Sequence, residues 1–315
     1  MNFQQRTCLV WLLPTLIVSG CGGSAGDDGS GALAGAIRID GSSTVFPITE
    51  AFAEEFQIAH PDVRVTVGIS GTGGGFQRFC SGETHLSNAS RPITESEVAA
   101  CEAAGVEFTE LPVAWDGLSV IANPANTFVS CLTVDELRRI WAPDSNVTTW
   151  RDVRSEWPGE AIRLYGPGTD SGTFDYFTET INGESGASRA DFQASEDDNI
   201  LVQGVAGDRY ALGYFGFAYY AENQDRLKLV EVDGGAGCVA PSDQTIEDGT
   251  YAPLSRPLYV YVRHAALERP EVRAYVQFML EEATTLVPAT GYHALSDEQY
   301  AEGLARVDGV VGGGA

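Results

Sequence analysis

The sequence is poor in basic side chains and in the arrangements that most often perform catalysis. It holds 19 Lys and Arg against 44 Asp and Glu, which gives a formal net charge of −25. So acidic a chain argues against nucleic acid or an anionic membrane surface as partners, because like charges repel. The four histidines lie in no recognisable nucleophile, triad or metal-binding pattern. We therefore expect a protein that is not an enzyme and holds no metal or other cofactor.

Long hydrophobic runs are also scarce, and the one at the start of the chain is typical of an export signal. Arg6 precedes an apolar run over residues 9–18, which is too short to span a membrane. We predict a signal peptide over 1–20. The run ends in Val-Ser-Gly-Cys, which resembles a bacterial lipobox and predicts a lipidated Cys21; a plain secretory signal is the alternative. Residues 21–35 would form a flexible tether.

This leader predicts a lipid-anchored protein outside the cytoplasm, in the periplasm or at the cell surface. Of the six cysteines, one lies in the signal and one at the lipidation position. The other four predict two disulfides with three possible connectivities, and buried thiols are the alternative. A metal site is disfavoured because no CxxC pattern accompanies them. We favour the pairing that keeps each bridge inside one of the lobes predicted below, because a bridge between lobes would hinder closure. The pairs are Cys80–Cys101 and Cys131–Cys238.

What the sequence does contain is three short clusters of Ser, Thr and Gly, each between a predicted strand and a predicted helix. A helix start offers free backbone N–H groups and the positive end of the helix dipole, and hydroxyls add further donors. Three such clusters converging on one point would bind a tetrahedral oxyanion. The clusters lie at residues 41–44, 70–75 and 170–173.

The residues around these clusters support their placement. Apolar and polar residues alternate over 63–69, before the second cluster, and this period of two predicts a strand. After the first cluster, apolar residues recur at helical spacing over 45–56. Strands and helices alternate through the rest of the chain, which favours an α/β fold over a β sandwich.

Two β-rich segments near a proline, 111–121 and 257–262, are predicted to cross between two lobes. If the chain leaves lobe one at the first and returns at the second, lobe one comprises 36–112 plus 257–315. Lobe two is then 113–256. The first two clusters would face the third across a cleft that could close about a hinge.

Six stretches carry a family resemblance, in order along nearly the whole mature chain. They are residues 40–48 (DGSSTVFPI), 70–76 (SGTGGGF), 87–93 (SNASRPI), 115–120 (WDGLSV), 170–174 (DSGTF) and 211–219 (ALGYFGFAY). Together they resemble the substrate-binding proteins of bacterial phosphate ABC transporters. The resemblance implies the α/β, two-lobed type II periplasmic-binding-protein fold, with two crossover hinge segments.

The resemblance also implies that phosphate lies between the lobes and passes to the transmembrane subunits of an ABC permease. We expect a monomer. Arg91 has a physical reason of its own to bind phosphate, because a guanidinium can donate two hydrogen bonds to one oxyanion. The implied ligands are Ser43, Thr44, Val45, Ser70, Thr72, Ser90, Arg91, Ser171, Gly172 and Thr173.

Two positions depart from the family pattern. Some members carry Asp where Arg91 stands. Some also carry Arg four positions before the Ser-Gly-Thr of the third cluster, where this chain has Pro167. The missing carboxylate matters because it can accept a hydrogen bond from protonated phosphate and repel fully ionised sulfate. Asp170 and Asp116 are candidate replacements, although Asp170 could instead cap a helix and Asp116 hold a turn.

Other functions stay open at this point. A phosphatase or serine hydrolase acting through Ser43 or Ser171 would be an enzyme, but no histidine arrangement supports one. The same fold could serve as a phosphate sensor without transport. It could also receive sulfate, molybdate or tungstate, because clusters of neutral donors suit any tetrahedral dianion. The sequence favours extracytoplasmic capture of phosphate for a permease.

Overall fold

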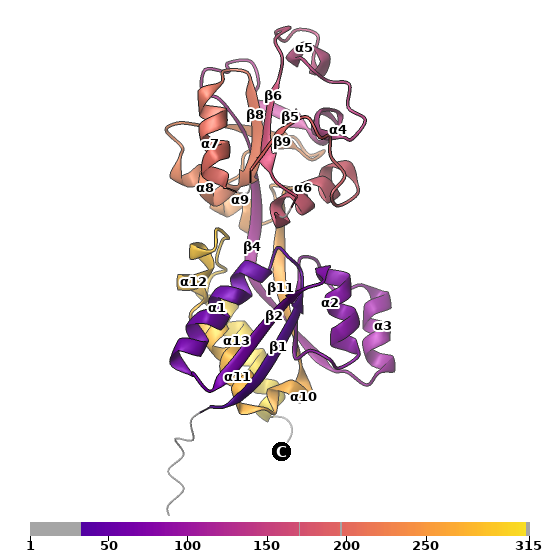
Figure 1. Cartoon of the computed structure of the whole chain (residues 1–315), viewed down its shortest axis with the longest axis vertical. Helices are drawn as coiled ribbons and strands as arrows, with labels where there is room; N and C mark the ends of the chain where they lie inside the picture. The colour runs from indigo at the N-terminus through magenta and orange to yellow at the C-terminus, as the bar shows by residue number, and fades with distance from the viewer. Residues whose placement is uncertain (1–32, 170, 196, 313–315) are drawn as a thin grey trace, which may run out of the picture. The chain divides into compact units, whose positions relative to one another are not determined.

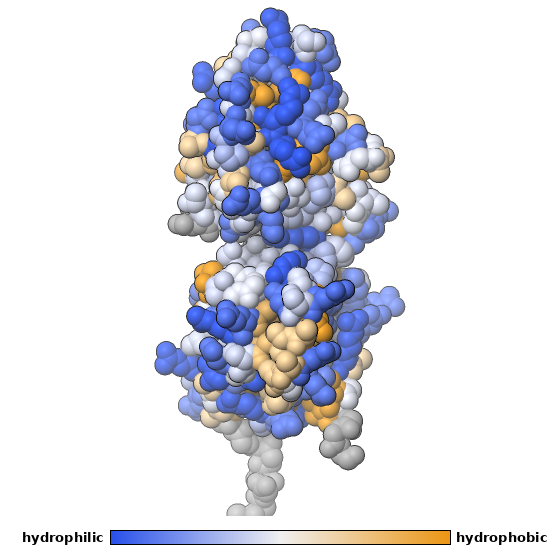
Figure 2. Space-filling view, turned by 90° about the vertical axis from the view of Figure 1, so that its right-hand side faces the viewer, coloured by the Kyte–Doolittle hydropathy of each residue, from blue (hydrophilic) through white to orange (hydrophobic). Residues whose placement is uncertain are grey.

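The computed structural model describes residues 33–169, 171–195 and 197–312. The predicted signal peptide, Cys21, most of the tether and Asp170 lie outside these residues. The face seen in Figure 2 is largely hydrophilic, with a hydrophobic patch in the middle of lobe one. Within the described part of the chain, no helix is long and apolar enough to cross a membrane.

Lobe one begins with three strand-to-helix units, and two of the predicted clusters lie at their junctions. These units are β1 (Gly35–Gly41) and α1 (Phe46–Ala59), β2 (Val63–Ile69) and α2 (Gly71–Cys80), and β3 (Leu86–Ala89) and α3 (Glu95–Ala103). The chain returns to this lobe through β11 (Ser255–Arg263), α10 (His264–Leu267), α11 (Pro270–Glu281), α12 (Ala283–Ala289) and α13 (Asp297–Gly312).

The sheet of lobe one has the strand order β2-β1-β3-β11-β4, where β4 spans Phe108–Ala122. β1 runs parallel to β2 and β3, and β11 runs antiparallel to β3 and β4. Side chains alternate between the two faces of β1, and those of Ile37 and Ile39 lie in a core with the apolar faces of α1, α11 and α13. Phe76 and Phe79 of α2 form a second core with α3 on the opposite face (Figure 1).

Lobe two is built from the middle of the chain. Its strands are β5 (Cys131–Thr133), β6 (Arg163–Pro167), β7 (Gln193–Ser195), β8 (Ala211–Gly216), β9 (Lys228–Asp233) and β10 (Cys238–Val239). Its helices are α4 (Val134–Trp141), α5 (Trp150–Val153), α6 (Gly172–Asn182), α7 (Asp198–Gly207), α8 (Phe217–Glu222) and α9 (Asp243–Glu247). Aromatic rings fill its core, where Phe177 stacks on Tyr214 with ring centroids 3.7 Å apart.

The two predicted crossover segments are the strands β4 and β11, which run between the lobes in Figure 1. β4 pairs with β11 from Phe108 to Gly117, and then with β8 and β9 over residues 118–122. One strand therefore belongs to the sheets of both lobes. This confirms the predicted α/β, two-lobed fold class, whereas the domain limits at 112/113 and 256/257 stay a prediction.

Both predicted disulfides are present. Cys80–Cys101 joins the end of α2 to α3, and Cys131–Cys238 joins β5 to β10. Each bridge connects elements of one lobe, so neither of them ties the lobes to each other.

Candidate functional site

A cavity of about 250 Å³ lies where the Ser/Thr/Gly clusters of lobe one face the helix that follows the third cluster. Lobe one supplies the starts of α1 and α2 and the loop after β3, and lobe two supplies α6. The lining residues are Ser42, Ser43, Thr44, Gly71, Thr72, Gly73, Ser90, Arg91, Asp175, Tyr176, Glu179, Ser185 and Arg256. Nearly all of them are polar, which suits an anion better than an apolar ligand.

The first cluster forms the turn from β1 into α1. The Ser42 backbone N–H donates to the Asn88 carbonyl at 3.0 Å, which fixes this turn against β3. α1 begins at Phe46, its N-cap residue Val45 makes no side-chain cap hydrogen bond, and a proline lies in its first turn. The Phe46 N–H donates to the Ser42 carbonyl at 3.1 Å and this proline has no N–H, so the backbone donors suited to an anion are those of the turn over 43–45.

The second cluster and the loop after β3 bring two hydroxyls together. Thr72 Oγ1 lies 3.1 Å from Ser90 Oγ and accepts from the Ser90 backbone N–H at 3.2 Å. The glycines here let α2 approach β1 closely, because a Cβ at Gly75 would lie 2.6 Å from Gly41 Cα. One of the two hydroxyls donates to the other, so the pair keeps one O–H for a ligand in the cavity.

Arg91 lines the cavity but is held by Glu97. Its Nη1 and Nη2 donate to the two carboxylate oxygens of Glu97, both at 2.9 Å. Glu97 is itself held by Thr94 in the capping box of α3. The hydrogen bonds that Arg91 donates to Glu97 raise the pKa of Arg91 above its usual value. The guanidinium is therefore oriented by the protein and stays charged, with part of its donor capacity already used.

Arg256 of β11 is a second guanidinium at the cavity, and the sequence analysis missed it. Its side chain is 14% exposed, and its Nη2 donates to Thr44 Oγ1 at 3.2 Å. Its Nε lies 3.3 Å from Asp116 Oδ2, and its Cζ lies over the Tyr176 ring, 3.5 Å from the ring centroid. Burial raises the pKa of Asp116, and the charge of Arg256 opposes that rise. Asp116 therefore pairs with Arg256, and it is not among the residues that line the cavity.

Lobe two contributes carboxylates that the sequence analysis also missed. Asp175 and Glu179 lie one turn apart on α6, and both line the cavity. Asp175 Oδ2 accepts from Ser43 Oγ at 3.5 Å, and its Oδ1 accepts from Ser185 Oγ at 3.1 Å. The Ser43 bond joins the two lobes directly across the cavity. The four-residue spacing on a helix predicted from the third cluster was a usable signal for this pair.

The ten predicted ligands divide into two equal groups. Five of them line the cavity, namely Ser43, Thr44, Thr72, Ser90 and Arg91. The other five are not among its lining residues, namely Val45, Ser70, Ser171, Gly172 and Thr173. The Ser70 hydroxyl donates to Asp40, and the Ser171 hydroxyl accepts from the Thr173 N–H at 3.2 Å as the N-cap of α6. These two hydroxyls are therefore engaged in local structure.

The first and third clusters nevertheless touch each other. Thr44 Oγ1 lies 3.5 Å from the Gly172 carbonyl oxygen, and a Cβ at Gly172 would lie 2.8 Å from Thr44 Cα. Only a residue without a side chain lets the start of α6 come this near to the start of α1. The described residues thus bring two helix N-termini together, as the sequence analysis expected.

Comparisons with known proteins agree with this arrangement. A family model described as the PBP superfamily domain matches residues 26–283. Protein SphX of Synechocystis sp. is 50% identical over 267 residues, which cover 84% of this chain and 80% of the relative. Phosphate-binding protein PstS of Staphylococcus saprophyticus is 38% identical over 300 residues, which cover 95% and 92%. A crystal structure of a possible phosphate binding protein from Planctomyces limnophilus matches with TM-score 0.86 and 50% identity, covering 89% and 99%.

Proposed function

Because this chain belongs to the PBP superfamily, we propose that it binds inorganic phosphate between its lobes and delivers it to an ABC permease. The observation that carries the proposal is the make-up of the cavity, where two guanidiniums and several hydroxyls meet helix N-termini. An anion loses its hydration on entering such a site, and aligned donors must replace it. Lipid on Cys21 would hold the monomeric protein outside the cytoplasm.

Arg256 is the main basic contact in this proposal. Its Nη2 already reaches Thr44 in the cavity, and its charge is offset by Asp116, which is only 4% exposed. Arg91 would add a second, partly engaged donor from the loop after β3. This assignment answers the departure at Pro167, because a guanidinium from β11 takes the place of the one that some family members carry before the third cluster.

Asp175 is the proposed acceptor for the proton of phosphate. Asp116, one of the two expected replacements, is committed to Arg256. Asp175 lines the cavity instead and points a carboxylate oxygen at Ser43. A carboxylate there accepts from a phosphate O–H but repels sulfate, which carries no proton near neutral pH. Glu179, one turn away, would strengthen the same preference.

Ligand capture would draw the lobes together. Donors and acceptors come from both lobes, so phosphate has more partners when the cavity is closed than when it is open, and binding shifts the population toward the closed form. β4 and β11 would carry the hinge, because the covalent crossings between the lobes run through them. The role is binding and release of an unchanged ion, without catalysis.

The experiment is a calorimetric titration of the chain, stripped of bound ligand, with phosphate, sulfate and molybdate. We expect tight binding of phosphate alone. In Arg256→Ala, phosphate affinity should fall about 100-fold, because a charged hydrogen bond to a desolvated ion contributes about 1.5–3 kcal/mol. Arg151 is exposed on α5, so Arg151→Ala removes the same charge and should bind as the parent does.

Two further measurements separate the loss of a phosphate contact from a loss of folding. Arg256→Ala leaves Asp116 buried without its partner, so its thermal unfolding is compared with that of Arg256→Lys, which keeps the charge. If the parent binds sulfate or molybdate as tightly as phosphate, the ligand assignment is wrong. If folded Arg256→Ala binds phosphate normally, the role given to Arg256 is wrong.

A further inference from the structure

Three arginines surround His85 at the end of lobe one where β1 begins. Arg38 lies on β1, Arg263 ends β11, and Arg269 precedes α11. β3 lies between β1 and β11 in the sheet, and His85 comes immediately before it. The His85 backbone N–H donates to the Arg38 carbonyl at 2.8 Å, and the Arg263 N–H donates to the His85 carbonyl at 3.2 Å. These four residues are called the basic cluster below.

Within the residues that the structure describes, Glu271 is the one carboxylate that pairs with a guanidinium of the basic cluster. Arg269 donates to Glu271 Oε1 from Nε at 2.9 Å and from Nη2 at 2.6 Å. Arg38 Nε donates to a backbone carbonyl, that of Glu83, at 2.6 Å. Among the described residues the Arg263 guanidinium has no hydrogen-bond or ion-pair partner, and its Nε is fully buried. In a chain with 44 acidic and 19 basic side chains, such a surplus of positive charge is unexpected.

The ring of His85 gives a second indication that an N–H donor here lacks an acceptor. Its ring is nearly buried, and its Nδ1 lies 3.0 Å from the Arg38 backbone N–H. Its Nε2 lies 2.8 Å from Arg269 Nη1. A neutral imidazole has one acceptor nitrogen, so whichever nitrogen carries the proton, one of these contacts sets two N–H groups against each other. Burial and the nearby arginines lower the pKa of His85 to about 4, which keeps the ring neutral.

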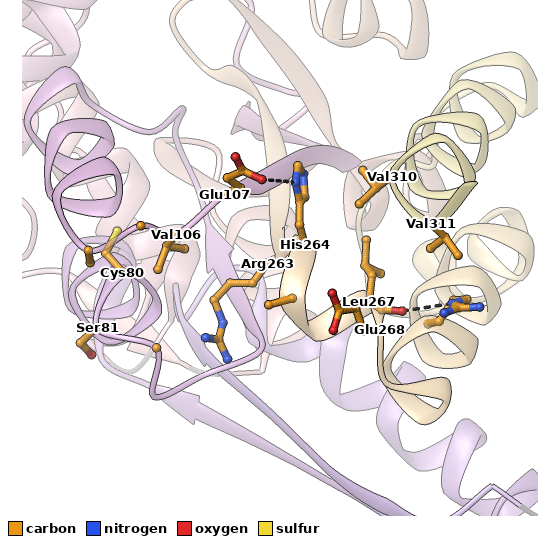
Figure 3. A pocket seen from close by; sticks show the side chains of 15 residues that line it. Cys80, Ser81, Val106, Glu107, Arg263, His264, Leu267, Glu268, Val310 and Val311 are labelled. Carbon is orange, nitrogen blue, oxygen red and sulfur yellow. Dashed lines mark hydrogen bonds and ion pairs between the residues drawn. The ribbon is translucent and has the colours of Figure 1, made fainter. Parts of the chain in front are cut away.

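A cavity of about 910 Å³ opens beside Arg263, which is the member of the basic cluster that lines it (Figure 3). Figure 3 shows the Arg263 side chain extending from β11 toward the turn that carries Ser81. The carboxylates nearby are already engaged in part: Glu107 pairs with His264 at 3.6 Å, and Glu83 accepts from Ser81 Oγ at 3.1 Å. Glu268 also lines this cavity. A small anion could thus reach Arg263 from solvent.

We propose that the basic cluster is a second anion site, which binds a phosphate group at Arg263, with Arg38 and Arg269 adding positive charge beside it. A tetrahedral oxyanion offers acceptors to several guanidiniums at once, and an unpartnered buried donor in a native structure calls for such a partner. The phosphate group could belong to free inorganic phosphate or to a lipid headgroup. The net negative charge of the chain would oppose both, so binding has to be local and short-ranged.

The place of the basic cluster makes a headgroup accessible. Glu271, which holds Arg269, packs against Gly35 at the start of β1. If Cys21 carries lipid, as proposed above, the 12 residues from Cys21 to Leu33 span at most about 40 Å. This end of lobe one can then reach the membrane surface. The free-phosphate alternative does not depend on the anchor.

The test uses the whole chain with Cys21→Ser and its cleft saturated with phosphate. Two probes are applied: further inorganic phosphate, followed by the backbone amide signals of Arg38, His85 and Arg263 in NMR spectra, and sedimentation with vesicles. The vesicles are phosphatidylcholine with or without phosphatidylglycerol. The variant Arg38→Gln/Arg263→Gln is compared with Arg151→Gln/Arg209→Gln, which removes two exposed charges from lobe two.

We expect one of the two responses, the amide shifts or the sedimented fraction, to appear in the parent and in the lobe-two control. In Arg38→Gln/Arg263→Gln the same response should be at least threefold smaller. A response to added phosphate identifies free phosphate as the ligand, and preference for phosphatidylglycerol vesicles identifies a headgroup. Silence of both probes, or equal responses of the two variants, would overturn the proposal. The first equivalent of phosphate should bind equally in all of them, so failure here is distinct from failure of the cleft assignment.

Discussion

Lobe one lines the cavity with hydroxyls and Arg91, lobe two lines it with the carboxylates of Asp175 and Glu179, and Arg256 reaches it from β11, which runs between the lobes. One wall therefore offers mainly donors and the other mainly acceptors. A ligand that matches both must carry unprotonated oxygens on one side and an O–H on the other. Phosphate near neutral pH is such an ion, and sulfate is not. The difference between the walls thus bears on selectivity as well as on affinity.

The lobes also differ in how their chains are bridged. The disulfide of lobe one joins residues 21 apart, and that of lobe two joins residues 107 apart. A bridge lowers the entropy of the unfolded chain more when it closes a longer loop. The two lobes should therefore depend on their bridges to different extents.

The largest effect is expected from removing these bridges one at a time. Cys131→Ala/Cys238→Ala should lower the free energy of unfolding by about 5 kcal/mol, and Cys80→Ala/Cys101→Ala by about 3 kcal/mol, on the loop-entropy model. Denaturant unfolding is followed by far-UV circular dichroism, which reports both lobes, and by tryptophan fluorescence, which reports lobe two because Trp141, Trp150 and Trp157 lie in its core. Equal losses in the two variants would show that loop length does not set the difference.

A smaller effect is expected where the lobes touch. Gly172→Ala places a Cβ 2.8 Å from Thr44 Cα, so the start of α6 can no longer approach α1. We expect phosphate affinity to fall about 30-fold, equivalent to about 2 kcal/mol, with little change in the unfolding of either lobe.

The matched control for this variant is Gly207→Ala in α7, where a Cβ would meet no atom within 4 Å. Calorimetric titration of both variants with phosphate gives the comparison. Unchanged affinity in Gly172→Ala would mean that this contact is not needed in the bound state.

The smallest effect concerns selectivity between anions. Asp175→Asn keeps the shape of the lobe-two wall but removes its charge and its strongest acceptor. We expect the ratio of phosphate to sulfate affinity to fall about tenfold, or about 1.4 kcal/mol, measured by competition titration. Asp225→Asn, exposed in the same lobe, should leave the ratio unchanged. A constant ratio in Asp175→Asn would move the acceptor role to Glu179.

The parts of the site that the sequence predicts are those set by local structure. A strand, a short Ser/Gly turn and a helix follow each other within a few residues, so the starts of α1, α2 and α6 are visible from the pattern alone. Arg256 gives no such signal. It lies in a β strand, and its role depends on Thr44, which is 212 residues away. Only the folded chain brings them together.

The sequence also does not show the hydrogen-bond partner of a hydroxyl, and some predicted ligands have other partners. Ser70 and Ser171 stand at helix starts, as an anion ligand would, but their hydroxyls bond Asp40 and the Thr173 N–H. Sequence cannot separate a hydroxyl that caps a helix from one that faces a ligand, because both need the same residue at the same place. The disulfide pairing was predictable because it followed from the order of lobes along the chain.

The chain order of the two cores bears on how the protein assembles during synthesis. The main core of lobe two draws on one continuous stretch, from Leu118 to Leu254. That of lobe one takes residues up to Ala114 and then from Leu258 onward. As the polypeptide emerges from its N-terminus, β1 to β3 must therefore wait, with their sheet edge unpaired, until β11 arrives. Lobe two can form first, and such a delay exposes the waiting strands to chaperones and to aggregation.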